Sequence, residues 1–532
     1  MAALAELADL IVAELRRTGT QALFGVPGGG GNLDLIEAAR KAGLPFVLTS
    51  TETGAAVAAT AQAEILQRPG ACLTTLGPGV ASVVNGIACA CLERAPLMLF
   101  TDSHPLSANG RFAHQQIDHV ALLKPITKWS ARLSSINANE TVQQAFHALT
   151  TLPPGPVHLD CPGDVTGKVE AARALPSGPA IAVDPQEAKR FDELVSGARK
   201  PLVLIGLGAR RPGGAAAIRE LCERRSVPAM VTYKGKGALP DAHPCFAGVF
   251  TNGSVERAIV GESDLLIGLG LDPVELLPRP WTFPQAVVGL NEWRLPAEHV
   301  PFAAQSIGNL TGQIRRLEAT IRGTEWDLET VATLAAGQRF TDTGGGGMGA
   351  QHVVDVAASA LAGAWRATVD AGAHMLPVMM RWPAARPDDL LISNGLSTMG
   401  FALPAAIGAA IADRQRPVVA LTGDGGLLIC IGELLTAVRE RLRLIVIVFS
   451  DTSLSLIEIK QQARQLPAAG VALGPMNWAA LAESFGARGF SARSEPELAM
   501  AIEQAAAHDG VSVIEAKIDR SNYGRMLKAI RG

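Results

Sequence analysis

The sequence has few aromatic residues, little excess charge and no C-x-x-C pair of cysteines. Aromatic residues make up 5% of the 532 residues, and the formal net charge is −3. A nucleic-acid-binding protein needs a basic surface to neutralise phosphates, so we expect no nucleic-acid partner. The seven cysteines are scattered and form no C-x-x-C pair. This pattern predicts a reduced, cytoplasmic protein without structural zinc.

Long apolar runs are also missing. No uninterrupted apolar run reaches 18 residues, so we expect no membrane-spanning helix and no membrane partner. The N-terminal segment MAALAELADLIVAELRR carries Glu6, Asp9 and Glu14 within its apolar pattern. A signal peptide would need a basic start and an unbroken apolar core, so this segment predicts an amphipathic helix.

Small and aliphatic residues are abundant in the sequence, and hydrophobic residues make up 48% of the chain. This composition and length predict an α/β fold of three consecutive domains, each a mostly parallel sheet flanked by helices. We place the domains at 1–165, 188–325 and 350–532, with joints at 166–188 and 341–350 that are rich in glycine, alanine or proline. Strands are predicted within 45–49, 71–75, 96–101, 156–162, 201–205, 263–272, 285–293, 366–370, 390–392, 417–421 and 444–449.

Two short motifs follow the last two predicted strands. LTGDGG at 421–426 holds Gly423, Asp424, Gly425 and Gly426, and FSDTSL at 449–454 holds Asp451. A glycine turn leading into a helix offers N–H groups to a phosphate, but a carboxylate there repels the phosphate unless a cation lies between them. Neighbouring parallel strands would bring both aspartates to one ion, with the oxygen ligands that Mg²⁺ prefers. GDG alone is common in surface turns.

The spacing of these motifs resembles a known family. GDG, then 24 residues (426–449), then Ser450-Asp451 is similar to the signature of thiamine diphosphate enzymes, in which Asn usually stands where Ser450 is. This resemblance implies that Asp424 and Asp451 bind Mg²⁺ through their side chains and Ser453 through its carbonyl. It also implies cofactor contacts by Gly28, Glu52, Ala371, Ala373, His374, Ser397, Met399, Gly423, Asp424, Gly425, Gly426, Asp451, Leu454, Ser455 and Leu456.

Two further segments extend the resemblance within the third domain. VDAGAHM at 369–375 is similar to the family segment that contacts the diphosphate, and it contains His374. ISNGLSTMGFALPAAIG at 392–408 is similar to the segment beneath the aminopyrimidine ring. There Met399 matches the bulky apolar residue that wedges between the two cofactor rings. Outside these motifs, a lone histidine or methionine would be interpreted as structural.

The first domain resembles the family's pyrimidine-binding domain over 24–39, 46–64 and 73–100. Glu52 matches the catalytic glutamate, which shares a proton with the pyrimidine ring so that the cofactor can lose its own carbon-bound proton. Taken alone, Glu52 would be interpreted as an exposed glutamate at a helix start. Gln115 matches the glutamine that faces the substrate in carboligases. In the family the pyrimidine domain of one chain faces the diphosphate domain of another, so we expect a homodimer at least and a homotetramer as the assembly.

Within the family, the chain most resembles acetolactate synthase-like proteins, over all three domains. This implies a transferase that decarboxylates a small-molecule 2-oxo acid and joins the remainder to a second carbonyl. The exact substrate stays open, because Thr51 stands where many relatives have His, and Lys460 stands where biosynthetic acetolactate synthases have Trp. Candidate substrate contacts are Gln115, Met375, Met379, Trp382 and Lys460, each of which could instead belong to the core or the surface.

Other functional interpretations of the sequence remain open. A 2-oxo acid decarboxylase of the benzoylformate decarboxylase type is disfavoured, because Thr75 and Gly29 stand where those enzymes carry His and Ser. A C–C lyase and a non-catalytic cofactor-binding homologue are further alternatives. The central domain resembles one that binds FAD in biosynthetic acetolactate synthases, but Arg211 occupies the third glycine position of an incomplete G-x-G-x-x-G. FAD is therefore not expected, although the sequence does not decide the matter.

Overall fold

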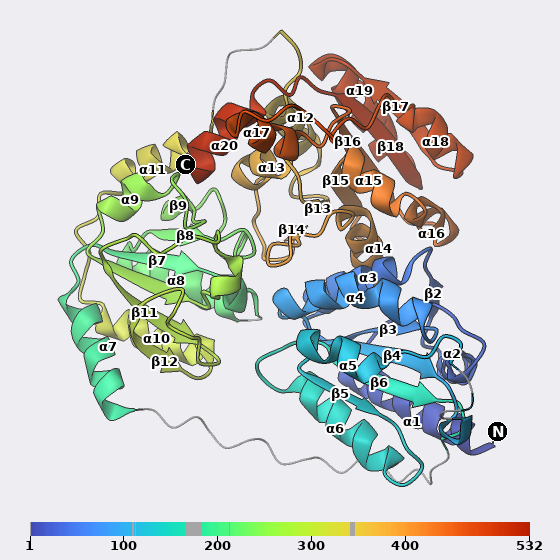
Figure 1. Cartoon of the computed structure of the whole chain (residues 1–532). Coiled ribbons are helices and arrows are strands. Elements are labelled where there is room, and N and C mark those ends of the chain that lie inside the picture. The colour runs from blue at the N-terminus through green and yellow to red at the C-terminus, as the bar shows by residue number, and fades with distance from the viewer. Residues whose placement is uncertain (1, 109–110, 112, 166–183, 212, 341–345) are drawn as a thin grey trace.

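The computed structural model describes residues 2–108, 111, 113–165, 184–211, 213–340 and 346–532, with side chains from residue 7 onward. Three six-stranded sheets follow one another along the chain (Figure 1), and all their strand pairs are parallel. Helices cover the sheets. The predicted α/β fold of three consecutive units is confirmed.

The first sheet has the strand order β2-β1-β3-β4-β6-β5. Its central strands are buried along their whole length, as expected for a parallel sheet covered on both faces. Its strands are β1 (Leu23–Val26), β2 (Phe46–Leu48), β3 (Gly70–Thr74), β4 (Leu97–Ser103), β5 (Trp129–Arg132) and β6 (Val157–Pro162). Its helices are α1 (Ala2–Thr18), α2 (Gly31–Lys41), α3 (Glu52–Leu66), α4 (Pro78–Leu92), α5 (His119–Leu123) and α6 (Ala138–Thr150), with 3-10 turns η1 (Leu106–Ala108) and η2 (Lys124–Ile126).

The central sheet has the order β12-β11-β10-β7-β8-β9, a doubly wound arrangement that changes direction between β7 and β10. Its strands are β7 (Pro201–Ile205), β8 (Ala229–Val231), β9 (Phe246–Val249), β10 (Leu265–Leu269), β11 (Ala286–Asn291) and β12 (Phe302–Ile307). Its helices are α7 (Pro185–Gly197), α8 (Gly214–Arg225), α9 (Arg257–Gly261), α10 (Leu310–Thr320) and α11 (Leu328–Gly337), with η3 (Leu207–Arg210) and η4 (Pro273–Glu275). Helix α7 packs on β12 and α11 on β9, so packing on this sheet extends past the predicted limits of 188 and 325.

The third sheet has the order β14-β13-β15-β16-β18-β17, which repeats the relative strand order of the first sheet. Its strands are β13 (Arg366–Val369), β14 (Leu390–Ile392), β15 (Val418–Gly423), β16 (Leu444–Ser450), β17 (Arg488–Ala492) and β18 (Val511–Lys517). Its helices are α12 (Ala350–Leu361), α13 (Met375–Arg381), α14 (Ala402–Ala412), α15 (Asp424–Cys430), α16 (Glu433–Arg439), α17 (Ser455–Ala463), α18 (Trp478–Ser484), α19 (Glu495–Ala506) and α20 (Tyr523–Arg531).

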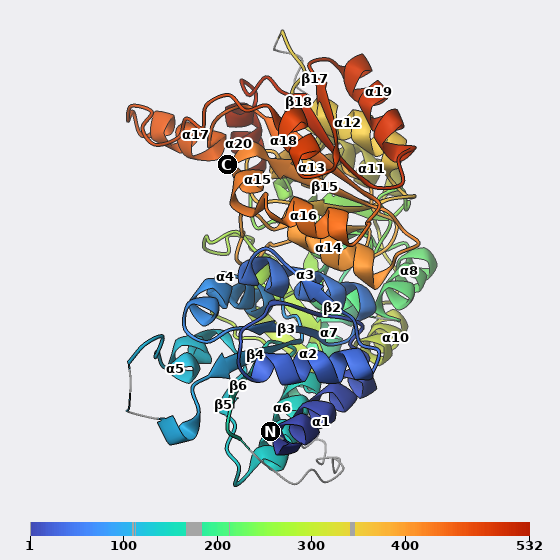
Figure 2. The ribbon, with the colours of Figure 1, turned by 90° about the vertical axis from the view of Figure 1, so that its right-hand side faces the viewer.

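Helices α3 and α14 join the first and third domains, and Figure 2 shows them lying against each other. Small residues permit the close approach: a Cβ on Gly408 would lie 2.0 Å from the carbonyl oxygen of Ala58. Val57 and Ala61 of α3 belong to the same buried cluster as the apolar side chains of α14. The two domains therefore share a core.

Two overall properties bear on the early predictions. Among the described residues, no helix is both long and apolar enough to cross a membrane. All seven cysteines are free thiols, as the scattered spacing suggested.

Candidate active site

Strands β15 and β16 are parallel neighbours, with Gly423 opposite Phe449. The residues after both strands therefore meet at one edge of the third sheet. There Oδ2 of Asp424 accepts the backbone N–H groups of Asp451 at 3.2 Å and Thr452 at 2.6 Å, while Oδ1 accepts that of Gly425 at 2.8 Å. Asp424 thus links the two loops that carry the predicted metal ligands.

The carboxylate of Asp451 is also held by hydrogen bonds. Asp451 accepts the Ser453 N–H at 3.0 Å and the Ser455 hydroxyl at 2.6 Å. Burial raises the pKa of Asp424, and burial also raises the pKa of Asp451 to about 6, with a further contribution from the charge of Asp424. Two partly buried carboxylates that repel each other suit a divalent cation between them.

The oxygen donors are those that Mg²⁺ prefers, but two carboxylates do not fill its coordination sphere. Within the described part of the chain, no group of three or more His, Cys, Asp or Glu side chains could hold a metal. A magnesium ion at this edge would need backbone, water or ligand oxygens, and Ser453 lies beside both loops. The residues present therefore fit a magnesium ion that is shared with an anionic ligand.

A cavity of about 200 Å³ opens at this edge. Every residue that the resemblance assigned to the third domain lines it: Ala371, Ala373, His374, Ser397, Met399, Gly423, Asp424, Gly425, Gly426, Asp451, Ser453, Leu454, Ser455 and Leu456. Four further lining residues were not predicted: Gly372, Phe449, Ile457 and Tyr523. Segments 371–374, 397–399, 423–426 and 449–457, which lie far apart in the sequence, thus meet around one space.

His374 supplies an unsatisfied polar group in the wall of this cavity. Its ring stacks on Phe449 with centroids 5.2 Å apart, and burial lowers its pKa to about 3. Its Nε2 atom is buried and has no hydrogen-bond partner within the described protein. A buried polar atom without a partner is costly, so an anionic ligand in the cavity would fit His374 well.

Asp370 organises the walls, although the sequence patterns did not single it out. Its fully buried carboxylate accepts the N–H groups of Gly400 at 3.1 Å and Phe401 at 2.9 Å, and the hydroxyl of Thr422 at 2.8 Å. Burial raises its pKa to about 6. The carboxylate connects the segment of Met399 to the GDG turn. Its position after a buried strand was the available signal.

The residues predicted in the first domain gather elsewhere, around the turn between β3 and α4. A Cβ on Gly79, at the start of α4, would lie 3.3 Å from Oε1 of Glu52, and one on Gly28 would lie 2.4 Å from Oγ1 of Thr75. Gln115 packs on Gly77 and has a left-handed backbone with φ of 56°. The structure therefore brings Gly28, Glu52 and Gln115 around one turn.

Glu52 begins α3, and Thr51 caps the helix by accepting the Gly54 N–H at 2.9 Å. The carboxylate of Glu433, from the third domain, accepts the N–H and the hydroxyl of Thr51, both at 3.0 Å. Among the described lining residues of the 200 Å³ cavity, Gly28, Glu52 and Gln115 are absent. Within one chain, the predicted site residues of the first domain and those of the third domain therefore lie in two separate places.

Three of the candidate substrate contacts belong to the core, which is one of the alternatives that the sequence left open. Met375, Met379 and Trp382 are buried in the hydrophobic core beside α13, with 5%, 0% and 1% exposure. Their apolar character serves packing, so they are not open to a substrate here. Lys460 lies exposed on α17.

The turn after the first strand of the central domain lacks the free N–H groups of a dinucleotide-binding turn. Such cofactors bind their pyrophosphate on free N–H groups after the first strand, at the point where the strand order reverses. Here the N–H of Leu207 donates to Oε1 of Glu275 at 2.7 Å, and the N–H of Gly208 donates to the Gly270 carbonyl at 2.9 Å. Both N–H groups are therefore already bonded within the chain, and whether FAD binds the central domain stays a prediction from the sequence.

Comparison with known proteins agrees with this geometry. Three family profiles match: the N-terminal thiamine pyrophosphate (thiamine diphosphate) binding domain at 5–122, the central domain at 189–290, and the C-terminal thiamine pyrophosphate binding domain at 370–516. The catabolic acetolactate synthase of Raoultella terrigena is 28% identical, over 96% of this chain and 95% of its own. The acetolactate synthase of Bacillus subtilis is 27% identical, over 97% and 93%.

A protein of Pseudomonas aeruginosa named probable 2-ketoarginine decarboxylase is also 27% identical, over 95% of this chain and 93% of its own. Similarity thus extends across all three domains to proteins named for different activities. Together with the order of the three matched domains, it establishes that this chain belongs to the thiamine pyrophosphate enzymes and resembles the acetolactate synthases over nearly its whole length.

Proposed function

We propose that this protein is a Mg²⁺- and thiamine diphosphate-dependent carboligase that decarboxylates a small 2-oxo acid and joins the remainder to a second carbonyl compound. The observation that carries the proposal is the single cavity lined by Asp424, Asp451, His374 and Met399. The similarity to acetolactate synthases supports the reaction class.

The residues of the cavity have distinct proposed tasks. Asp424, Asp451 and the carbonyl of Ser453 would hold the magnesium ion, and His374 would contact the diphosphate. Met399 is 36% exposed in spite of its apolar side chain, which suits a residue that packs against a bound ring. When bound, thiamine diphosphate supplies an electron sink that allows cleavage of the bond next to a carbonyl.

The acid–base task is proposed for Glu52. Its carboxylate lies near Gly79 and stands outside the lining of the cavity. We propose that a second copy of the chain brings its own Glu52 and Gln115 to this cavity, so that the active unit is at least a homodimer, with a homotetramer as the expected assembly. Glu52 would exchange a proton with the pyrimidine ring, and Gln115 would orient the 2-oxo acid.

A 2-oxo acid decarboxylase is the second candidate, and the similarity to the Pseudomonas aeruginosa protein favours it over other rivals. It differs from a carboligase only in the fate of the fragment left after decarboxylation. A cytoplasmic location and the absence of nucleic-acid partners stay predictions from composition.

The test is an assay of the purified protein with pyruvate, thiamine diphosphate and Mg²⁺, which follows pyruvate loss, acetolactate and acetaldehyde. Acetolactate formation that is lost in Glu52→Gln and Asp424→Asn would support the carboligase. Acetaldehyde alone would favour the decarboxylase. If calorimetry finds cofactor binding but pyruvate is untouched, the substrate is wrong, and larger 2-oxo acids become the next substrates. Absence of Mg²⁺-dependent cofactor binding would overturn the proposal.

A further inference from the structure

A buried ammonium group lies where the three domains meet. Lys234 follows β8 of the central domain, and its side chain is 1% exposed. Its Nζ atom lies 2.8 Å from Oε1 of Glu64, 2.9 Å from Oε2 of Glu93 and 3.0 Å from the carbonyl oxygen of Ile392. An ammonium group has three hydrogens to donate, and here each has an acceptor from another domain.

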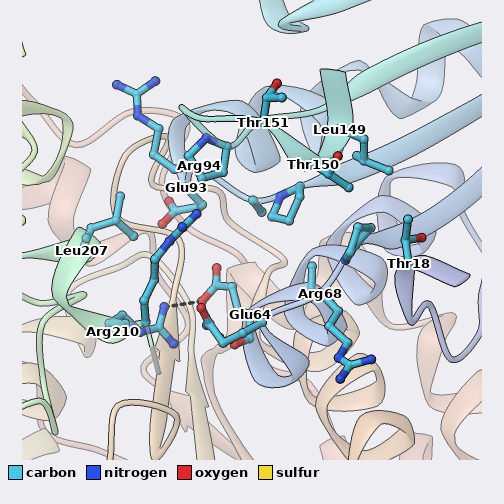
Figure 3. Close-up of a pocket in the computed structure, with 18 of the residues that line it drawn as sticks. Thr18, Glu64, Arg68, Glu93, Arg94, Leu149, Thr150, Thr151, Leu207 and Arg210 are labelled. Atoms are coloured by element: carbon cyan, nitrogen blue, oxygen red, sulfur yellow. Dashed lines mark hydrogen bonds and ion pairs between the residues drawn. The ribbon is translucent and has the colours of Figure 1, made fainter. Parts of the chain in front are cut away.

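The surrounding charges balance. Glu64 also pairs with Arg210 at 2.6 Å, so two cations face two carboxylates. Figure 3 shows Arg210 and Glu64 joined across the wall of a cavity of about 320 Å³ between the first and central domains, with Glu93 nearby. Burial alone would lower the pKa of Lys234, but the carboxylates of Glu64 and Glu93 raise it, so the side chain stays charged.

This cluster holds the segment that carries Met399. Ile392 ends β14, and three residues later the N–H of Gly395 donates to Oε1 of Glu93 at 2.9 Å. Between them, Nδ2 of Asn394 donates to the backbone carbonyl of Glu275 at 2.8 Å. The segment 392–395 is therefore bound to the first and central domains immediately before it reaches the cofactor cavity.

The space around the segment leaves it little freedom to shift. A Cβ on Gly395 would lie 2.8 Å from Cβ of Leu92. Ser397 then adopts a left-handed backbone with φ of 56°, and both Ser397 and Met399 line the 200 Å³ cavity. A strained residue persists only where its surroundings fix it, so the contacts of 392–395 help to fix the backbone that leads to Met399.

We propose that Lys234, acting through Glu93 and the Ile392 carbonyl, is a positioning residue that sets the geometry of segment 393–400 and thereby the affinity for the cofactor. This inference rests on the proposed function, since it concerns the same cavity. By this inference the central domain aligns one wall of the active site, a task that needs no nucleotide.

The test uses pairs of substitutions that keep the buried charge balanced, because a single change would leave a buried ion unpaired. Lys234→Met/Glu93→Gln keeps an acceptor for the Gly395 N–H, whereas Lys234→Met/Glu93→Leu removes it. The matched control is Lys236→Met/Asp241→Asn. Lys236 is equally buried in the same loop, but its ion-pair partner is Asp241 at 2.7 Å and not Glu64 or Glu93.

Two measurements are made on each full-length variant: calorimetric affinity for thiamine diphosphate with Mg²⁺, and hydrogen–deuterium exchange of peptides spanning 393–401 without cofactor. We expect the Leu variant to bind the cofactor roughly tenfold more weakly, the loss typical of a buried donor without a partner. The Gln variant should lose less cofactor affinity, and the control should lose none. Hydrogen–deuterium exchange at 393–401 should rise only in the two Lys234 variants.

The outcomes separate this inference from the proposed function. Equal affinity and equal exchange in all proteins would overturn the positioning role. An equal loss of cofactor affinity in the control would also overturn the positioning role, because it would indicate general destabilisation. If the Leu variant does not fold, the Gln variant decides by exchange at 393–401 relative to the control. A parent protein that does not bind the cofactor would overturn the proposed function and this inference with it.

Discussion

Gly426 lies directly above the buried carboxylate of Asp370, and a Cβ there would lie 2.1 Å from Oδ2. We therefore expect Gly426→Ala to displace Asp370 and to lower the free energy of unfolding by about 1–3 kcal/mol, the usual cost of overpacking a core. Chemical denaturation measures this. Gly261→Ala is the control, because a Cβ there would meet nothing within 4 Å. Equal effects of the two substitutions would contradict the role assigned to Asp370.

His374 offers a test in which binding and stability separate. His374→Phe keeps a ring against Phe449 but removes Nε2, which has no partner within the described protein. We expect cofactor affinity to fall about tenfold through loss of one hydrogen bond to a charged group, with little change in melting temperature. Calorimetry and thermal unfolding measure the two quantities. An unchanged affinity would remove His374 from the diphosphate site.

The sequence motifs predicted the residues of the third-domain cavity well, because GDG and its partner segments are short and follow strands directly. Asp370, Phe449 and Tyr523 were missed for a physical reason. Their contributions depend on contacts with segments distant in sequence. Asp370 accepts hydrogen bonds from Gly400 and Thr422, and Phe449 packs on His374. Met379 and Trp382 failed as substrate contacts because an apolar residue near a motif can equally belong to the core.

At the scale of elements, the contact between α3 and α14 is the most sensitive to side-chain size. A Cβ on Gly408 would lie 2.0 Å from the Ala58 carbonyl oxygen, so Gly408→Ala must push the helices apart. We expect a loss of about 1–3 kcal/mol in the free energy of unfolding, measured by denaturation. Gly312→Ala in α10 is the control, since its nearest neighbour would be 3.7 Å away. If both substitutions behave alike, the close approach does not limit stability.

The sequence predicted strands with long apolar runs, such as β4, β15 and β16, but it missed the strands β1, β8, β9 and β12. The edge strands β5 and β17 escaped prediction because they are partly exposed and carry polar residues. Strand β18 was missed although it is buried, because Glu515 and Lys517 interrupt its pattern. Glu515 is satisfied inside the protein by the hydroxyls of Ser450 and Ser491, which no local pattern reveals.

At the scale of the molecule, pH should act on the junction of the domains through Glu275. Burial raises the pKa of Glu275 from 4.5 to about 8, with a further increase from Asp272, which pairs with Arg94. The folded protein then keeps a proton that the unfolded chain releases. The stability that Glu275 contributes is therefore complete below about pH 4.5 and is lost as the pH rises through about 8, by up to about 1.4 kcal/mol per pH unit.

The measurement compares the parent with Glu275→Gln by denaturation at several pH values. The advantage of the Gln variant relative to the parent should grow steadily from about pH 5 to about pH 8, because glutamine carries no proton to lose. Parallel stability curves across this range would show that the Glu275 carboxyl is already ionised.

The repeated strand order of the first and third sheets has a consequence for how the chain is put together. Helix α3 follows the second strand of the first sheet, and α14 follows the second strand of the third. Equivalent helices therefore pack against each other, as the same surface of both copies does in an isologous dimer. The first and third domains thus share a strand order and meet through equivalent helices, as two copies of one unit could do in a dimer, although the central domain separates them in the sequence.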